Sequence, residues 1–190
     1  MGELGAILRI QVQREPLKAP HGWYDPSRIV AVDEAELTSL GLVGIRGGER
    51  IVDAHHADHP RSRGGGRRAL SVGFRGHYDA MAARFGERVR LGIAGENLVV
   101  DGPAVRTEDL AGGLVIVTAD GVEVELRAPR PAAPCREFTT FLLGGREPRP
   151  RDELVDELEF LSGGTRGFIV SVGHLTAPVV LRVGDVVRVG

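Results

Sequence analysis

The chain has 190 residues, with 24 basic and 26 acidic side chains and a formal net charge of -2. This length suits one domain, so we expect a single domain over residues 1–190 with a core that needs no disulfide staples. The nearly balanced charge argues against a general nucleic-acid binder. A lone cysteine excludes an internal disulfide, no apolar run is long enough to span a membrane, and no signal peptide is evident. These features predict a cytoplasmic protein.

Short strands separated by turn signals dominate the chain. Alternating apolar and polar residues predict strands over 6–13, 28–32, 51–53, 69–72 and 97–100, a hairpin over 114–127, and closing strands over 168–172, 179–183 and 186–189. Helices are expected over 33–40, where Asp33 and Glu36 fit a capping box, and over 74–85 and 152–161. His77 lies off the apolar stripe of the second helix and is expected to be exposed. With few helices and no βαβ alternation, the pattern predicts a mainly β fold, a β-barrel with a few peripheral α-helices.

Cys135 is the only cysteine, and it follows a proline-rich segment between Arg130 and Arg136. A thiol acts as nucleophile or metal ligand in its thiolate form, and nearby cationic groups lower the pKa of a thiol. This setting favours a reactive sulfur. A single cysteine is more often a small buried apolar residue, so the sequence leaves both interpretations open.

Two neighbouring segments carry further polar chemistry. Residues 53–59 contain three histidines and two aspartates, a set that can bind a transition metal or can form an exposed polar loop. Residues 61–68 hold three consecutive glycines among arginines, including Arg67 and Arg68. Backbone N–H groups of such a loop and arginine side chains bind phosphate, although the spacing matches neither a P-loop nor a dinucleotide fingerprint. A flexible surface loop is an equally open interpretation.

Five stretches in consistent order resemble the MOSC domain, the module named for the C-terminal part of molybdenum cofactor sulfurase. They are Gly41-Leu42-Val43-Gly44, His55 to Val72, Gly95-Glu96-Asn97 with the residues up to Gly102, Pro129 to Cys135, and Thr165 to Phe168 with 183–187. Three positions depart from the family pattern. Ile45 stands in place of an aspartate, Gly113 stands where a second Gly-Asp is expected, and Arg130 is five residues before Cys135 instead of three.

The resemblance implies a standalone MOSC-type β-barrel that binds a molybdenum cofactor (molybdopterin). Cys135 is then the metal ligand and the catalytic residue. The arginines expected to hold the pterin and its phosphate are Arg67, Arg68, Arg130, Arg136 and Arg166, and the residues expected to line the cofactor pocket are Glu96, Asn97 and His56. The implied reaction is reduction of an N-oxygenated small-molecule substrate. A separate electron-transfer protein supplies the electrons, since one cysteine cannot hold an iron–sulfur cluster.

Two alternatives remain open at this stage. In the first, Cys135 carries a persulfide for the assembly of a metallo-sulfur cofactor and receives the sulfur from a cysteine desulfurase, a pyridoxal phosphate-linked sulfur transfer. A lone thiol suits this role because no second cysteine can resolve the persulfide into an internal disulfide. In the second alternative the barrel binds a ligand without catalysis and Cys135 is inert.

Overall fold

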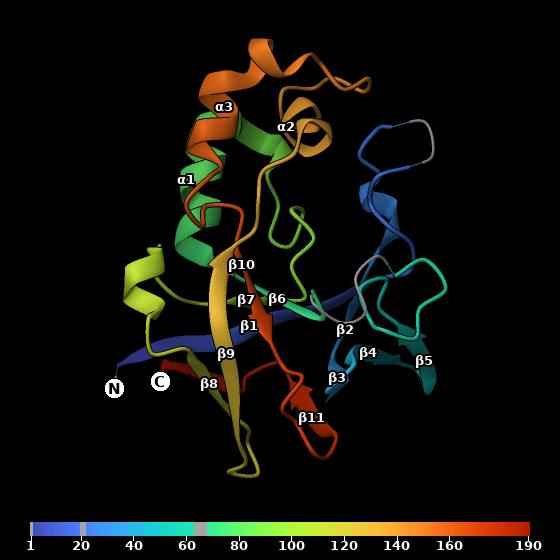
Figure 1. Ribbon diagram of the computed structural model, residues 1–190, viewed down its shortest axis with the longest axis vertical. Coiled ribbons are helices and arrows are strands. Elements are labelled where there is room, and N and C mark those ends of the chain that lie inside the picture. Colours follow the sequence, from blue (N-terminus) through green and yellow to red (C-terminus); the bar gives the residue numbers. More distant parts are fainter. Residues whose placement is uncertain (1, 20–21, 63–67) are drawn as a thin grey trace.

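The computed structural model describes residues 2–19, 22–62 and 68–190, and its main body is a closed β-barrel (Figure 1). Neighbouring strands follow the order β12-β8-β9-β10-β6-β7-β1, and pairing of β12 with β1 closes the ring. Only β6 and β7 are parallel neighbours in this ring. The bounds are β1 (Glu3–Gln13), β6 (Leu70–Phe74), β7 (Leu98–Val100), β8 (Leu114–Val117), β9 (Glu123–Pro131), β10 (Phe168–Ser171) and β12 (Val186–Val189). The predicted mainly β fold is confirmed.

A second sheet of four strands lies beside the barrel, in the order β11-β3-β4-β5. Its strands are β3 (Glu34–Thr38), β4 (Gly41–Arg46), β5 (Glu49–Val52) and β11 (Val179–Arg182), while β2 (Ile29–Val32) pairs with β1. The helix predicted over 33–40 is therefore wrong. Ala35 and Leu37 are fully buried while their neighbours face outward, and β3 has a strand on each side. Hydrogen bonding of β3 to a strand on each of its two sides outweighs the local capping-box pattern, which favours a helix.

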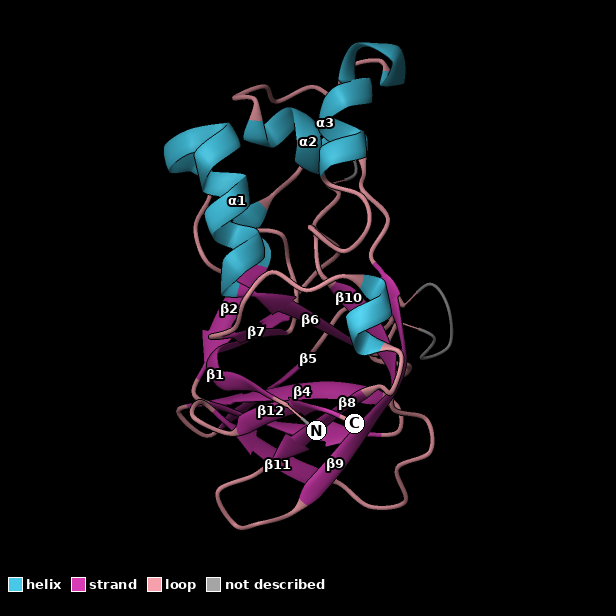
Figure 2. Cartoon of the chain, turned by 90° about the vertical axis from the view of Figure 1, so that its left-hand side faces the viewer, coloured by secondary structure: helices cyan, strands magenta, loops and turns pink. Residues whose placement is uncertain are grey.

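The three α-helices gather at one end of the barrel, as Figure 2 shows. They are α1 (Arg75–Phe85), α2 (Arg136–Leu142) and α3 (Val155–Phe160). Short 3₁₀ helices span Pro26–Arg28, Gly86–Arg88, Thr107–Leu110 and Arg151–Leu154. The helix predicted over 74–85 is confirmed. The one predicted over 152–161 divides into a 3₁₀ turn and α3, and α2 was not predicted. In the described part of the chain, no helix is both long and apolar enough to cross a membrane.

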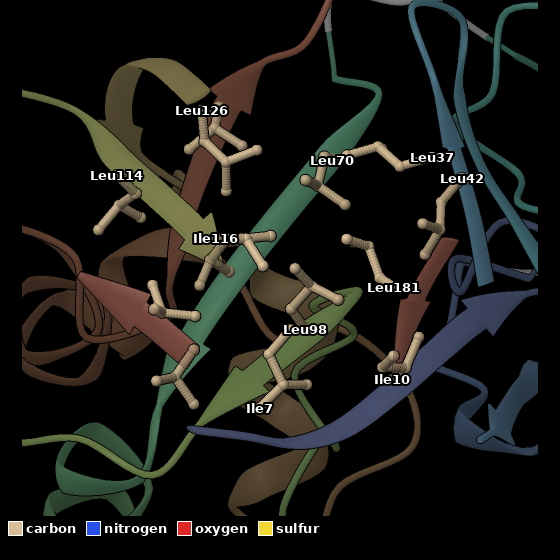
Figure 3. Close-up of a cluster of buried hydrophobic side chains, with 14 of the residues drawn as sticks. Ile7, Ile10, Leu37, Leu42, Leu70, Leu98, Leu114, Ile116, Leu126 and Leu181 are labelled. Carbon is tan, nitrogen blue, oxygen red and sulfur yellow. The ribbon is translucent and has the colours of Figure 1, made fainter. Parts of the chain in front are cut away.

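Two apolar clusters hold these layers together. Apolar side chains from every strand of the barrel meet in its interior, and many of them are leucines and isoleucines (Figure 3). The second cluster joins the helices to the barrel end, and it includes Tyr24, Tyr78, Met81, Phe138 and Leu161, with the half-buried Cys135 packed against it. Full burial of each large apolar side chain contributes roughly 1.5–3 kcal/mol. Cys135 therefore lies where the helical layer meets the barrel.

Two single-residue expectations about the helical layer are wrong. His77 is buried instead of exposed, because its imidazole packs against the rings of Phe74 and Phe168 and Nε2 lies 2.9 Å from the carbonyl oxygen of Val105. Val155, which helical spacing places on the buried face of α3, is 56% exposed. The helix begins only at this residue, so the spacing counted from 152 does not apply.

Candidate active site

Cys135 lies between the end of β9 and the start of α2. Its backbone is extended, and its carbonyl oxygen accepts hydrogen bonds from the backbone N–H and the hydroxyl of Thr139 at 3.0 and 2.9 Å. Pro131 pairs with Phe168 across β9 and β10. This register places the residues after β9 beside those before β10, so that Cys135 meets a segment more than thirty residues away in sequence.

Arg166 is the arginine that reaches the sulfur. Its Nη1 lies 3.3 Å from Sγ of Cys135 and 2.9 Å from the carbonyl oxygen of Ala133, and its guanidinium carbon lies 5.2 Å from the centre of the Phe138 ring. Burial alone lowers the pKa of Arg166, but the sulfur of Cys135 and the oxygens of Tyr24 and Glu96 more than offset this, so the pKa is raised. The guanidinium is a permanent cation beside the sulfur.

Glu96 supplies a buried carboxyl group to the same region, and only 3% of the residue is exposed. Oε2 accepts a hydrogen bond of 2.5 Å from the Tyr78 hydroxyl, while Oε1 is sealed from solvent and has no hydrogen-bond partner among the residues that the structure describes. Burial raises the pKa of Glu96 to about 7, although the Tyr78 hydrogen bond and the charge of Arg166 act in the opposite direction. At neutral pH this carboxyl group therefore exchanges readily between its acid and its base form.

Two glycines make room for the Glu96 side chain. A Cβ atom at Gly73 would lie 2.7 Å from Oε1, and one at Gly167 would lie 2.8 Å from Cγ. Gly167 also has a φ of 93°, in the left-handed region that favours glycine. Both positions thus need glycine for the carboxyl group to fit between β6 and the start of β10.

Aromatic side chains form the apolar wall of the site. The Tyr24 ring lies 5.0 Å from that of Phe138 and 5.3 Å from that of Phe141, measured between ring centres. The Tyr24 hydroxyl donates to the carbonyl oxygen of Ile93 at 2.6 Å, and burial raises the pKa of Tyr24 far above its ordinary value. Tyr24 is therefore neutral and fixed.

Asn97 is placed differently from its neighbour Glu96. Its Oδ1 accepts from the N–H and the hydroxyl of Ser71, both at 3.0 Å, and its Nδ2 donates to Asp53 Oδ2 at 3.1 Å and to the carbonyl oxygen of Gln11 at 3.3 Å. All of its polar atoms thus have partners within the protein. Asn97 ties β6, β1 and the segment after β5 together behind the site.

The remaining predicted residues lie farther from the sulfur or outside the described residues. Arg130, Arg136 and Arg68 are exposed, and no hydrogen bond joins any of them to Cys135. Arg67 lies outside the described residues. His56 is buried on the wall of a separate hollow.

The histidine-rich segment does not form a metal centre in the described structure. Among the residues described, no three His, Cys, Asp or Glu side chains are arranged to hold a metal ion. Asp53 is fully buried and accepts from the backbone N–H groups of Gln13 and His55 at 2.7 and 2.9 Å. It serves as a structural acceptor.

Sequence reasoning missed three side chains of this site: Tyr24, Tyr78 and Phe138. The spacing of Tyr78 on the apolar stripe of α1 predicts only core packing, and the position of Tyr24 in a loop predicts only anchoring of that loop. Both side chains do pack in the second apolar cluster. A hydroxyl on a helical apolar stripe was the only available signal, because a buried tyrosine hydroxyl needs a polar partner.

Comparison with known proteins identifies the family and the fold. The family model described as "MOSC domain" matches residues 59–188. Among solved structures, the YuaD protein from Bacillus subtilis is 14% identical with a TM-score of 0.54, and the match covers 98% of this chain and 94% of that one. YiiM from Escherichia coli is 18% identical with a TM-score of 0.53, and 97% of this chain and 69% of that one are covered. None of the curated proteins matches the sequence significantly.

The chain belongs to the MOSC domain family, since the family model covers more than half of it. The structural neighbours share the fold across nearly the whole chain at low identity. Binding of a molybdenum cofactor is a general property of this family.

Proposed function

We propose that this chain holds a molybdenum cofactor at Cys135 and with it reduces N-oxygenated small molecules. The observation that supports this best is the 3.3 Å contact between Arg166 Nη1 and the half-buried sulfur of Cys135. Cations beside a sulfur favour the thiolate, the form that ligates a metal. Membership of the MOSC family makes molybdenum the metal to expect.

The residues present fit such a cofactor. The thiolate of Cys135 is a soft ligand suited to a transition metal. Arg166 uses Nη1 within the protein, while its Nε and Nη2 have no partner among the described residues and can donate to an anionic group. Glu96 adds a buried Oε1 without a hydrogen-bond partner.

A bound molybdenum cofactor supplies two-electron transfer, and the protein supplies position and protons. Reduction of an N-hydroxyl compound to the amine consumes two electrons and two protons and releases water. A separate electron-transfer protein provides the electrons. Arg166 keeps the sulfur oriented, Glu96 holds a proton on its carboxyl group near neutral pH, and the rings of Tyr24 and Phe138 exclude water from one side.

Metal analysis tests this proposal. Protein produced in a host that makes molybdopterin is expected to contain molybdenum in stoichiometric amount, and Cys135→Ser is expected to lose it while keeping the circular dichroism of the parent. Arg136→Gln, which changes an exposed arginine next to the cysteine, is the matched control and is expected to retain the metal. Molybdenum missing from both parent and control, or retained by Cys135→Ser, would contradict the proposal.

A second candidate is sulfur transport on the same atom. The half-buried Cys135 has no other cysteine in the chain to displace a persulfide from it. In this role a cysteine desulfurase donates the sulfur. Intact-mass measurement after incubation with a desulfurase and cysteine is expected to show the mass of one added sulfur, which disappears with reductant and in Cys135→Ser. An unchanged mass removes this candidate.

A further inference from the structure

A hollow lies on the outer face of the β11-β3-β4-β5 sheet, away from Cys135. The inward side chains of this sheet, such as Leu37 and Leu42, belong to the barrel core, while the alternate residues Glu36, Val43 and Arg50 line the hollow. Its volume is about 400 Å³, within the usual size range of small-molecule sites.

Strand β10 separates this hollow from the site at Cys135. Arg166, which contacts the sulfur, precedes the strand, whereas Leu175 in the wall of the hollow follows it. The two sites therefore lie at opposite ends of β10.

His56 gives the hollow a buried hydrogen-bond donor. Only 5% of the residue is exposed, and its Nδ1 accepts the backbone N–H of Asp58 at 3.2 Å, so the ring carries its proton on Nε2. The opposite edge of the ring is packed against Gly41, where a Cβ atom would lie 3.2 Å from Cδ2. Nε2 has no hydrogen-bond partner among the described residues, yet it is not among the nitrogen atoms sealed from solvent. His56 thus contributes to the wall of the hollow a ring nitrogen with no acceptor in the described part of the chain.

The walls also carry a carboxylate without a strong partner. Glu36 is neutralised by Arg50, with Oε1 and Nη2 separated by 2.7 Å, and this hydrogen bond lowers the pKa of Glu36. Asp58 is different, because its side chain is 72% exposed and its nearest basic group in the described chain is the imidazole of His56, with Oδ2 and Nδ1 separated by 4.0 Å. The charges lining the hollow thus sum to one negative charge, which favours a cationic ligand over an anionic one.

Several of the side chains that line the hollow are apolar. Among them, Leu40 and Val52 are 42% and 38% exposed, and Leu175 and Pro178 belong to the same wall. A mostly apolar lining with a few polar groups is the usual composition of a small-molecule site.

We propose that this hollow binds a small organic cation that also carries a hydroxyl or carbonyl oxygen. The oxygen accepts the hydrogen bond of His56 Nε2, the ammonium group pairs with Asp58, and the hydrocarbon part covers Leu40 and Val52. The site is separate from Cys135 and does not depend on the function proposed there.

Titration of the ¹⁵N-labelled full chain with 2-amino-1-phenylethanol tests this site by NMR. Saturable shifts are expected at the backbone amides of Leu40, Asp58 and Thr176. Two analogues give the chemical comparison. 2-Phenylethylamine lacks the oxygen and is expected to bind about threefold to tenfold more weakly, the effect of one lost hydrogen bond. Mandelate carries a carboxylate in place of the ammonium group and is expected not to bind.

One matched pair of variants completes the test. Asp58→Asn changes an exposed carboxylate of the hollow and is expected to weaken binding of 2-amino-1-phenylethanol, again by about threefold to tenfold. Asp152→Asn changes an exposed carboxylate at the helical end and is expected to have no effect. Shifts that do not saturate, equal binding of mandelate, or equal affinity of Asp58→Asn and its control would each overturn the proposal.

Discussion

The interior of the barrel and the polar cluster of Cys135, Arg166 and Glu96 at its helical end are built in opposite ways. In the interior, large apolar side chains such as Ile10, Leu70 and Leu98 are fully buried and contact one another. The polar cluster instead contains a buried carboxyl oxygen on Glu96 without a hydrogen-bond partner among the described residues, together with the half-buried Arg166 and Cys135. Burial of such polar groups costs free energy, whereas burial of apolar side chains in the interior stabilises the fold. The comparison indicates that the barrel interior provides stability that the polar cluster lowers.

The largest expected effect lies on the barrel side of this comparison. Phe74→Ala removes a fully buried ring whose centre lies 6.2 Å from that of Phe168 and 5.9 Å from that of His77. We expect the free energy of unfolding to fall by about 3–5 kcal/mol, as for other buried phenylalanines. Urea denaturation measures this change in the free energy of unfolding. Val122→Ala, at a residue that is 46% exposed, is the control and should change little. Similar values for the two variants would contradict the assignment of the core.

The polar cluster is tested by Glu96→Gln, which keeps an oxygen to accept the Tyr78 hydrogen bond. The pKa of Glu96 is about 7 in the folded protein, against an ordinary value of 4.5. Between these values the folded state holds a proton that the unfolded state has lost, so stability falls as pH rises. Each pKa unit of difference corresponds to about 1.4 kcal/mol, so ionisation of this carboxyl group lowers the free energy of unfolding by about 3 kcal/mol once the pH exceeds both pKa values.

Urea denaturation from about pH 5 to about pH 8 measures this difference. Glu96→Gln is expected to lose less stability than the parent over this interval and to be the more stable protein at the upper end. Glu123→Gln, an exposed glutamate on β9, should follow the parent. Parallel curves for the parent and Glu96→Gln would show that the carboxyl group is not held in its neutral form by burial.

The smallest expected effect concerns the arginine at the sulfur. Arg166→Gln is expected to slow alkylation of Cys135 by iodoacetamide roughly tenfold at neutral pH, the size of one hydrogen bond to a charged group. Because the chain has one cysteine, the rate reports on this sulfur alone. Arg136→Gln, the sequence neighbour, is expected to react like the parent. If Arg136→Gln reacted more slowly and Arg166→Gln reacted like the parent, Arg136 and not Arg166 would be the arginine that acts on the sulfur.

The sequence by itself predicted the strands of the barrel. Alternation of apolar and polar residues is a local property, so 6–13, 114–127 and 186–189 could be assigned without knowing their partners. It also pointed to Cys135 and to the MOSC family. The error at 33–40 arose because a capping-box pattern and strand alternation overlap there, and only the neighbouring strands β4 and β11 favour the strand.

The tertiary structure alone decided which groups meet at the sulfur. Sequence proximity favoured Arg130 and Arg136, but both side chains are exposed, and the register of β9 with β10 brings Arg166 to Cys135 instead. The protonation of Glu96 was likewise beyond the sequence, since it follows from burial between Gly73 and Gly167. Local patterns specify strands because alternation follows backbone geometry, whereas charges and contacts in a pocket depend on segments that only folding brings together.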